Sequence, residues 1–230
     1  GLQQRYEGLF MTNFTAARTT MVDCQVRPSD VTKYPIIDAL LTVPREEFVP
    51  SAKRSVAYMG EHIELGRSRV VFDARTFAKM LDAVNIQPDE MVLDLGCGLG
   101  YSSAVIAKLA EAVVAVEADV EMASQAAELL ATNGADNVIV ETGELTAGAP
   151  KHGPYCVIFL QGATENIPST VTDQLKIGGR IIAIRQANGT GQCKIGHKRE
   201  NGMDWRSMFG ATAPILPGFE KVAEFTFGLQ

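Results

Sequence analysis

The sequence predicts an α/β fold: a mostly parallel sheet with helices on both faces, an antiparallel hairpin near its C-terminal end, and a helical cover before it. Two observations carry this prediction. Strand-like and helix-like segments alternate after residue 88, an order that requires a parallel sheet covered on both sides. Before residue 88 the apolar positions recur with helical spacing instead. We therefore expect a helical region over residues 1–88 and a sheet region over residues 89–230.

Composition narrows the class of protein. Of the 230 residues, 46% are hydrophobic and 21% are charged, which is ordinary for a globular protein and excludes a disordered chain. The formal net charge of −6 provides no positive field for phosphate backbones, so we expect no nucleic-acid partner. No apolar run reaches the roughly 18 residues of a membrane span, and residues 1–10 lack the layout of a secretion signal. The widely spaced Cys24, Cys97, Cys156 and Cys193 indicate neither a metal site nor disulfides and favour the cytoplasm.

The helical region is expected to hold several short helices, each placed by its apolar spacing and by a capping residue. The expected helices are residues 15–23 capped by Asn13, a helix capped by Asp30 that buries Ile36, Ile37, Leu40 and Leu41 and ends at Pro44, residues 45–48, residues 53–59, and a helix begun by Asp73 or Thr76. The last of these turns Phe77, Met80, Leu81 and Val84 toward the core.

The sheet region is expected to alternate strands and helices until its last third. The expected strands are residues 91–95, 112–116, 138–141, 155–160 and 179–185, and the expected helices are residues 101–110, 120–133 and 166–175. Residues 192–199 and 203–209 flank Asn201-Gly202, which indicates a hairpin. Residues 219–227 alternate weakly and predict a further edge strand.

One run of residues carries the chemistry of the sequence. A buried strand ends in Asp94, three glycines follow at Gly96, Gly98 and Gly100, and a helix begins at Tyr101. Glycines at these positions allow a sharp turn and let a ligand lie against the backbone with no Cβ between them. In an open parallel sheet such a ligand binds at the carboxyl ends of the strands, where the strand order reverses.

The residues around this turn suit a cationic nucleoside better than a dinucleotide. The dinucleotide fingerprint G-x-G-x-x-G does not match, and a carboxylate at Asp94 would repel a pyrophosphate. Glu117 ends the next strand, where it can accept two ribose hydroxyls, and Gly143-Glu144-Leu145 follows the third strand, where an acceptor can meet the amine of adenine. Together these features predict S-adenosyl-L-methionine as the ligand. A dinucleotide or an empty turn is the alternative.

Several of these residues also have ordinary structural interpretations. Glu144 can be a solvated loop acid, and Cys97 is interpreted as a small filler between two glycines rather than a nucleophile. Tyr101 packs on the ligand or is a surface aromatic of its helix. The three histidines, His62, His152 and His197, do not cluster in the sequence and receive no catalytic role.

The sequence resembles the protein-L-isoaspartate O-methyltransferase family from about residue 19 to residue 217. The resemblance is carried by MVDCQVRPSDVTKYPIIDALLTVPREEFVP from residue 21, VLDLGCGLGYSSAVIAKLA from residue 92, VVAVEAD from residue 113, PYCVIFLQGATENIP from residue 154 and LKIGGRIIAI from residue 175. The segments VPREEFVP and ENIP…QLKIGGR are more specific than the glycine-rich turn, which most such methyltransferases share.

The resemblance implies a Rossmann-like methyltransferase sheet, S-adenosyl-L-methionine as cofactor, and repair of isoaspartyl residues in damaged proteins. Its substrates would be proteins or peptides with isoaspartyl residues, or a small carboxylate. On this resemblance Asp94, Gly96, Gly98 and Gly100 line the methionine part of the cofactor, Glu117 holds the ribose and Glu144 lies by the adenine. The remaining cofactor-binding candidates are Cys97, Tyr101, Ala118, Gly143, Leu145 and Gln161.

One departure from the family concerns its substrate loop, a motif similar to T-I-S-A-P. The aligned residues here are Val70, Val71, Phe72, Asp73 and Ala74, so Phe72 replaces the serine and Ala74 replaces the proline. Asp73 would repel an anionic substrate. The compensating candidates are Ser68 and the arginines Arg67, Arg69 and Arg75, which alternatively form a solvated basic stretch.

The departure leaves the acceptor open. The alternatives to an isoaspartyl methyltransferase are a methyltransferase with another acceptor, a non-catalytic protein that binds the cofactor, and a dinucleotide oxidoreductase. A carboxylate acceptor is already ionised at neutral pH, so no general base is required and no catalytic residue is assigned beyond the substrate loop.

Overall fold

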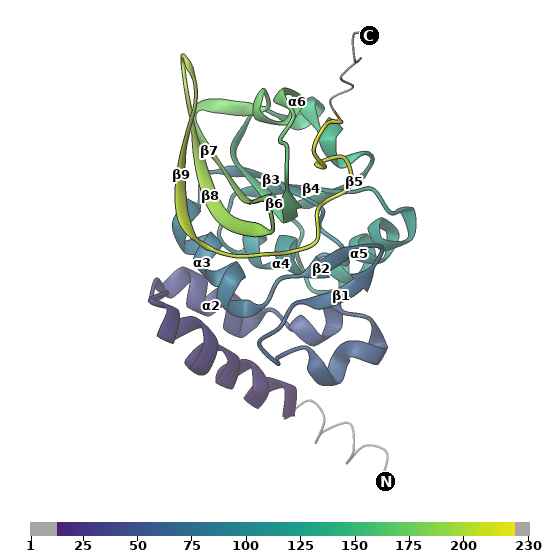
Figure 1. Cartoon of the computed structure of the whole chain (residues 1–230). Coiled ribbons are helices and arrows are strands. Elements are labelled where there is room, and N and C mark those ends of the chain that lie inside the picture. The colour runs from purple at the N-terminus through teal and green to yellow at the C-terminus, as the bar shows by residue number, and fades with distance from the viewer. Residues whose placement is uncertain (1–12, 224–230) are drawn as a thin grey trace, which may run out of the picture.

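A seven-stranded sheet with the order β5-β4-β3-β6-β7-β8-β9 forms the centre of the fold in the computed structural model, which describes residues 13–223 (Figure 1). The strands are β3(Met91–Leu95), β4(Ala112–Glu117), β5(Val138–Thr142), β6(Tyr155–Thr164), β7(Leu175–Ala187), β8(Thr190–Arg199) and β9(Gly202–Gly210). The strands from β5 to β7 are parallel, and β8 and β9 are added antiparallel at one edge. This confirms the predicted sheet and its C-terminal hairpin.

Helices and short helical turns surround this sheet. Residues 13–21 are helical, followed by η1(Val22–Val26), η2(Arg27–Ser29), α2(Tyr34–Thr42), η3(Arg45–Phe48), η4(Ser51–Val56), α3(Ala74–Val84), α4(Tyr101–Ala107), α5(Val120–Thr132), η5(Leu145–Ala147), η6(Pro150–His152) and α6(Ser169–Thr172). The N-terminal helices, drawn in purple in Figure 1, gather on one side of the sheet. No helix within residues 13–223 is long and apolar enough to cross a bilayer.

Neighbouring residues of the buried strands alternate between the two faces of the sheet. Val92 on β3 contributes to the larger hydrophobic cluster, which includes residues of α2, α3 and α4. Leu93 and Leu95 contribute to a second cluster with Val171 of α6 and Leu216. Both faces are therefore covered, as the near-continuous apolar strands predict.

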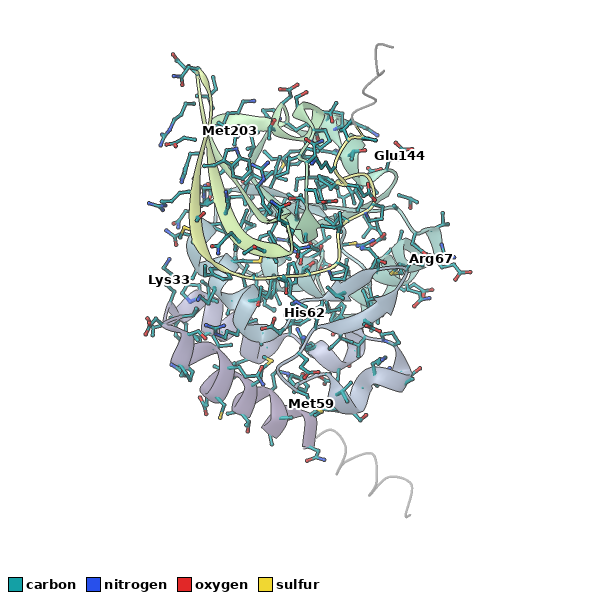
Figure 2. All side chains as sticks on the ribbon, viewed as in Figure 1. Lys33, Met59, His62, Arg67, Glu144 and Met203 are labelled. Carbon is teal, nitrogen blue, oxygen red and sulfur yellow. The ribbon has the colours of Figure 1, made fainter. Side chains whose placement is uncertain are left out.

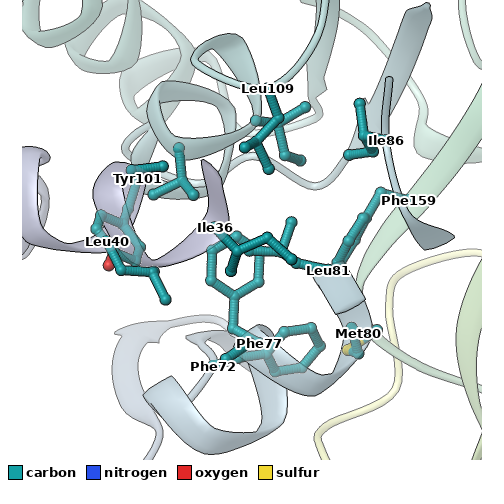
Figure 3. Close-up of a cluster of buried hydrophobic side chains, with 14 of the residues drawn as sticks. Ile36, Leu40, Phe72, Phe77, Met80, Leu81, Ile86, Tyr101, Leu109 and Phe159 are labelled. Carbon is teal, nitrogen blue, oxygen red and sulfur yellow. The ribbon is translucent and has the colours of Figure 1, made fainter. Parts of the chain in front are cut away.

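The larger cluster joins the N-terminal cover to the sheet. Phe77 of α3 lies between Tyr101 of α4 and Phe159 of β6, with ring centroids 5.9 and 5.7 Å apart. Figure 3 shows these rings together with Phe72 and with side chains of α2 in one packed group. The cover and the sheet thus share a core, and the division at residue 88 stays a prediction.

A two-stranded hairpin, β1(Ile63–Gly66) and β2(Arg69–Val71), precedes α3 and was absent from the predicted elements. Its turn residues, Arg67 and Ser68, both adopt left-handed backbone conformations, with φ of 51° and 58°. Hairpin turns of this kind are normally signalled by asparagine, aspartate or glycine. Arginine and serine gave no such signal.

Some predicted elements are wrong. Asp30 does not cap α2, because it is left-handed at the end of η2; the helix begins after Lys33, with a proline in its first turn. The helix predicted over residues 166–175 is reduced to α6, and Leu175 already begins β7. Residues 219–223 form no strand, and the rest of the predicted edge strand lies outside the described residues. Asn13 lies within the first helix rather than before it.

Arg180 of β7 ties the end of α3 to the residues that lead into β3. Its guanidinium donates to both carboxylate oxygens of Glu90 at 2.7 Å and to the carbonyls of Val84 and Asn85 at 2.6 and 3.0 Å. Burial raises the pKa of Glu90, but hydrogen bonds from Arg180 and from the backbone N–H of Gln87 outweigh it, so the pKa is lowered. A carboxyl whose pKa is lowered by folding stabilises the protein above its unfolded pKa.

The Glu90→Gln variant tests this clamp. We expect it to lower the free energy of unfolding by about 1 kcal/mol at neutral pH, because the pair is partly screened by solvent. The difference from the parent protein should shrink as the pH falls below the ordinary glutamate value of 4.5. Urea unfolding between pH 3 and pH 7 measures the difference in free energy of unfolding between the variant and the parent protein. Asp89→Asn removes an exposed neighbouring carboxylate and serves as the control. A difference that stays constant with pH would contradict the assignment.

Candidate functional site

The candidate site lies where the strand order reverses, between the carboxyl ends of β3, β4 and β6. Strand β3 pairs with β4 on one side and with β6 on the other. We call the space above Gly96, Gly98 and Gly162 at these strand ends the crevice. Ligands of open parallel sheets bind at this position because the connecting loops diverge there.

Asp94 occupies the predicted place near the end of β3 and is fully buried. Its Oδ2 accepts from the hydroxyls of Ser102 and Ser103 at 2.6 Å, and its Oδ1 accepts from Nε2 of Gln161 at 2.9 Å. Burial raises the pKa of Asp94, although these three hydrogen bonds and the charge of Arg69 act in the opposite direction. Both oxygens of the carboxylate are therefore engaged within the chain.

Glu117 ends β4 and is also fully buried. Its Oε1 accepts from the backbone N–H of Gly98 at 2.8 Å, and its Oε2 accepts from the N–H of Asp119 at 3.0 Å. The same Oε2 forms an ion pair of 2.7 Å with Nη1 of Arg69, whose side chain is 3% exposed. The carboxylate predicted to hold a ribose is thus paired with an arginine of β2.

The glycine-rich turn has the backbone conformation that the sequence predicts. Gly96, Gly98 and Gly100 have φ of 87°, 59° and 104°, a region that favours glycine. A Cβ on Gly100 would lie 3.2 Å from Leu130, so this glycine serves the packing of α5 rather than a ligand. Gly96 and Gly98 face the crevice.

Side chains of the chain itself fill the space above these glycines. A Cβ on Gly96 would lie 2.8 Å from Nη2 of Arg69, and a Cβ on Gly98 would lie 2.6 Å from Cδ1 of Leu65. On the β6 side, a Cβ on Gly162 would lie 2.6 Å from Cγ of Leu216. The predicted strand ends, glycines and acids are all present. The backbone of the glycine-rich turn, however, is covered by side chains of the hairpin and of Leu216.

The remaining cofactor-binding candidates lie in different surroundings. Tyr101 is buried in the larger cluster, where the Arg45 guanidinium lies 5.0 Å from its ring centroid, so it is not a surface aromatic. Cys97 packs against Ala115 and Ala126 as a small filler, and burial raises the pKa of its thiol well above the ordinary value. The others divide into the exposed Ala118, Gly143 and Glu144 and the buried Leu145 and Gln161.

Residues of the predicted substrate loop are buried in the core or cap a helix. Phe72 is 2% exposed within the larger cluster, and its carbonyl accepts from Nη2 of the buried Arg45 at 2.8 Å. Asp73 caps α3 by accepting from the N–H of Thr76 at 3.0 Å. Ala74 is buried and Val71 is partly buried, whereas Ser68 is exposed at the hairpin turn. These residues therefore pack and cap, and Phe72 presents no side chain to solvent.

His62 fastens the same loop to the C-terminal segment. Its Nδ1 accepts from the N–H of Asp73 at 3.0 Å, so Nε2 carries the proton and donates to the carbonyl of Thr212 at 2.8 Å. Figure 2 shows His62 nearer the middle of the molecule and Arg67 at its rim. Within residues 13–223 no group of three potential ligands could hold a metal ion.

Three residues of the crevice were not selected from the sequence as cofactor-site residues: Leu65, Arg69 and Leu216. Arg69 was considered only as a neighbour of the substrate loop. A signal for Leu65 and Arg69 would have required recognition of the hairpin, which places β2 beside the end of β4. Leu216 reaches the crevice because residues 214–216 pair with Ala163 at the end of β6.

In this conformation, side chains of the protein itself lie where the predicted S-adenosyl-L-methionine would bind. Its ribose would need Glu117, whose Oε1 and Oε2 already accept from Gly98, Asp119 and Arg69. The space over Gly96 and Gly98 holds the side chains described above. Nε and Nη2 of Arg69 are buried and have no hydrogen-bond partner among the described residues. The frame suits the cofactor, and side chains of the hairpin and Leu216 lie over the glycines in the free protein.

A Gly98→Ala variant tests whether this turn faces a ligand. Both Gly98→Ala and its control Gly134→Ala place a Cβ at positive φ, 59° and 71°, which should lower the free energy of unfolding by about 1–2 kcal/mol in each. Gly98→Ala should lower it further, because its Cβ would lie 2.6 Å from Cδ1 of Leu65. Only Gly98→Ala also puts a methyl group into the crevice, because Gly134 has no atom within 4 Å of the added Cβ. Urea unfolding measures the free energy of unfolding. Calorimetry with S-adenosyl-L-homocysteine measures binding, which Gly98→Ala should weaken and Gly134→Ala should not. Unchanged binding by Gly98→Ala would contradict the placement.

Comparison with known proteins supports the predicted relationship. The family model described as protein-L-isoaspartate(D-aspartate) O-methyltransferase matches residues 18–209. The curated protein-L-isoaspartate O-methyltransferase of Roseiflexus castenholzii is 32% identical over 74% of this chain and 78% of its own length. The protein of the same name from Gloeobacter violaceus is 36% identical over 70% of this chain and 79% of its own length.

Solved structures share the fold. A structure described as a protein-L-isoaspartate O-methyltransferase superposes with a TM-score of 0.77 at 24% identity, covering 87% of this chain and 66% of that one. A Plasmodium falciparum protein in complex with S-adenosyl-L-homocysteine superposes with a TM-score of 0.74 at 15% identity, covering 88% and 97% of the two chains. By the extent of the family match and the identity to these relatives, the chain belongs to the protein-L-isoaspartate(D-aspartate) O-methyltransferase family.

Proposed function

We propose that this protein is an S-adenosyl-L-methionine-dependent methyltransferase that transfers a methyl group to the carboxylate of isoaspartyl residues in proteins and peptides. The observation that carries the proposal is membership of the family over residues 18–209 in a chain that keeps buried acids at the ends of β3 and β4 beside a glycine-rich turn. The four cysteines are free thiols, which supports the cytoplasm as its compartment.

The proposed site consists of the predicted residues at the three strand ends. Its centre is Asp94 and the turn over Gly96 and Gly98, and beside them Glu117 accepts from two backbone N–H groups. The outer candidates are Ala118, Gly143 and Glu144. A carboxylate acceptor is already ionised at neutral pH, so the reaction requires alignment rather than a general base, and alignment alone can account for about 7–11 kcal/mol of a barrier.

A methyltransferase of the same frame with another acceptor is the second candidate. It is favoured by the substrate loop, in which Phe72 is a core residue and Asp73 is a helix cap. Neither side chain offers the hydroxyl that the family places there. The acceptor would then be held by other parts of the chain.

Methyl transfer to an isoaspartyl peptide tests the proposed function directly. We expect tritium from labelled S-adenosyl-L-methionine to appear on an isoaspartyl peptide and not on the same peptide with a normal aspartyl residue. The label should be released by mild base, because a methyl ester forms. Equal transfer to both peptides would favour the second candidate, and no transfer to either would reject the proposal.

Restoring the family's hydroxyl by Phe72→Ser tests whether the loop selects the acceptor. We expect this variant to lower the free energy of unfolding by about 3–5 kcal/mol, because it empties a buried aromatic position. Phe72→Leu, which keeps most of the volume, should lose less. Transfer to the isoaspartyl peptide should not rise in either variant, since position 72 lies in the core. A folded Phe72→Ser with a higher rate would show that the loop faces the acceptor.

A further inference from the structure

The β1–β2 hairpin and the C-terminal segment close the crevice from two sides. Leu65 and Arg69 come from the hairpin and lie over Gly98 and Gly96. Leu216, which is 1% exposed, comes from the segment that pairs with Ala163 and lies over Gly162. Leu216 also approaches Gly96, where an added Cβ would lie 3.3 Å from its Cδ2, so among these glycines Gly98 alone is covered by the hairpin without Leu216.

Arg69 takes the position on Glu117 that a ribose would need. Its Nη1 donates to Oε2 at 2.7 Å, and both side chains are buried, with exposures of 3% and 0%. A neutral pair of hydroxyls and a guanidinium are both hydrogen-bond donors, so they compete for the same acceptor. Removal of the cation is what makes the carboxylate available.

The arginine is incompletely satisfied in this position. Nε and Nη2 form the edge of the guanidinium that normally binds a carboxylate with two parallel hydrogen bonds, and neither has a partner among the described residues. Buried donors without acceptors are unfavourable. In the closed conformation Arg69 thus forms one strong contact, with Glu117, and leaves Nε and Nη2 unsatisfied. Because those two donors gain partners when the side chain moves, its release from Glu117 is partly compensated.

The outer contact of the hairpin is weak. Arg67 pairs with Asp119 at 3.2 Å, but its side chain is 84% exposed, and exposed pairs contribute little. The hairpin turn has no further ion pair among the described residues. Release of the Arg69–Glu117 pair would leave only the exposed Arg67–Asp119 ion pair between the hairpin and residues 117–119 among the described residues.

The movable part is bounded by fixed residues on both sides. Ile63 is buried in a small cluster with Val49 and Ala57. Phe72 is buried, and its carbonyl is held by Arg45. Residues 64–71 lie between these anchors. Val70 is also buried in the larger cluster, so the part that can move is residues 64–69, which carry the partly buried Leu65 and the exposed turn.

We propose that the β1–β2 hairpin is an intramolecular latch: Arg69 occupies the nucleoside-binding carboxylate Glu117 in the closed protein, and a purine nucleoside sulfonium or thioether binds only after the hairpin releases it. The proposal rests on the proposed function for the identity of the ligand. It assigns Arg69 as a positioning residue that sets cofactor affinity, with no contact to the reacting atoms.

Calorimetry with S-adenosyl-L-homocysteine tests the latch. A ligand that binds only the open form gains affinity when the closed form is destabilised. We expect Arg69→Ala to lower the Kd about tenfold or more, Arg69→Lys to lower it less because a cation remains, and Leu65→Ala to lower it a few-fold. The control variants are Arg67→Ala, whose exposed pair should change the Kd less than twofold, and the exposed Arg206→Ala on β9, which should not change it.

Hydrogen exchange on the unaltered protein provides a second measurement that needs no variant to fold. With saturating S-adenosyl-L-homocysteine, amides of residues 64–69 should exchange faster than in the free protein, because the hairpin leaves the end of β4. Amides of α3 should be unchanged, since its cluster is not disturbed. Slower exchange in residues 64–69 would mean that the hairpin closes over the ligand, and the latch would be wrong.

The two proposals fail separately. If Arg69→Ala binds no more tightly than the parent protein while methyl transfer to the isoaspartyl peptide is observed, the latch is rejected and the function stands. If Arg69→Ala binds more tightly and no acceptor is methylated, the latch stands and the function is rejected. If neither protein binds S-adenosyl-L-homocysteine, the crevice is permanently closed and both are rejected.

Discussion

The buried carboxylate of Glu117 organises the carboxyl edge of the sheet. It accepts from the N–H of Gly98 in the turn after β3, from the N–H of Asp119 before α5, and from Arg69 of β2. A charge with no exposure is tolerated only when it is paired and hydrogen-bonded, and in the closed protein these three contacts meet that requirement. One side chain thereby fixes the relative positions of two loops and of the hairpin.

Much of this fold follows from local patterns in the sequence. The apolar strands, the periodic apolar face of α3 and the glycines that need positive φ are all short-range signals, and the structure confirms them. The acids Asp94 and Glu117 were placed correctly because a strand end is a local feature. The parts of the site built from contiguous residues were therefore predictable.

The occupation of the crevice was not predictable, because it depends on contacts between residues far apart in the chain. Arg69 and Glu117 are 48 positions apart, and Leu216 reaches Gly162 only through the pairing of the C-terminal segment with Ala163. The hairpin itself was missed because arginine and serine occupy its left-handed turn. Phe72 was interpreted as a change in the substrate loop, and its burial in the larger cluster also depends on residues far apart in the chain.

The shared core of the cover and the sheet limits how the protein can open. Arg45, Phe72 and Phe77 tie the cover to α4 and β6, so a ligand cannot gain entry by separating the two layers. The hairpin and the segment around Leu216 are the remaining elements over the glycines. The substrate loop, which is held by Arg45 and His62, stays in place.

The side chains that fill the crevice also affect how ligand binding can be detected. The melting temperature of a protein rises with ligand only by the observed binding free energy, which already includes the loss of contacts that the free protein makes with itself. If Leu65 and Arg69 leave this space when a ligand binds, the stabilisation from the contacts that they make in the free protein is lost. A natural ligand of this crevice would therefore produce a small thermal shift, and a screen that ranks compounds by melting temperature would place it low.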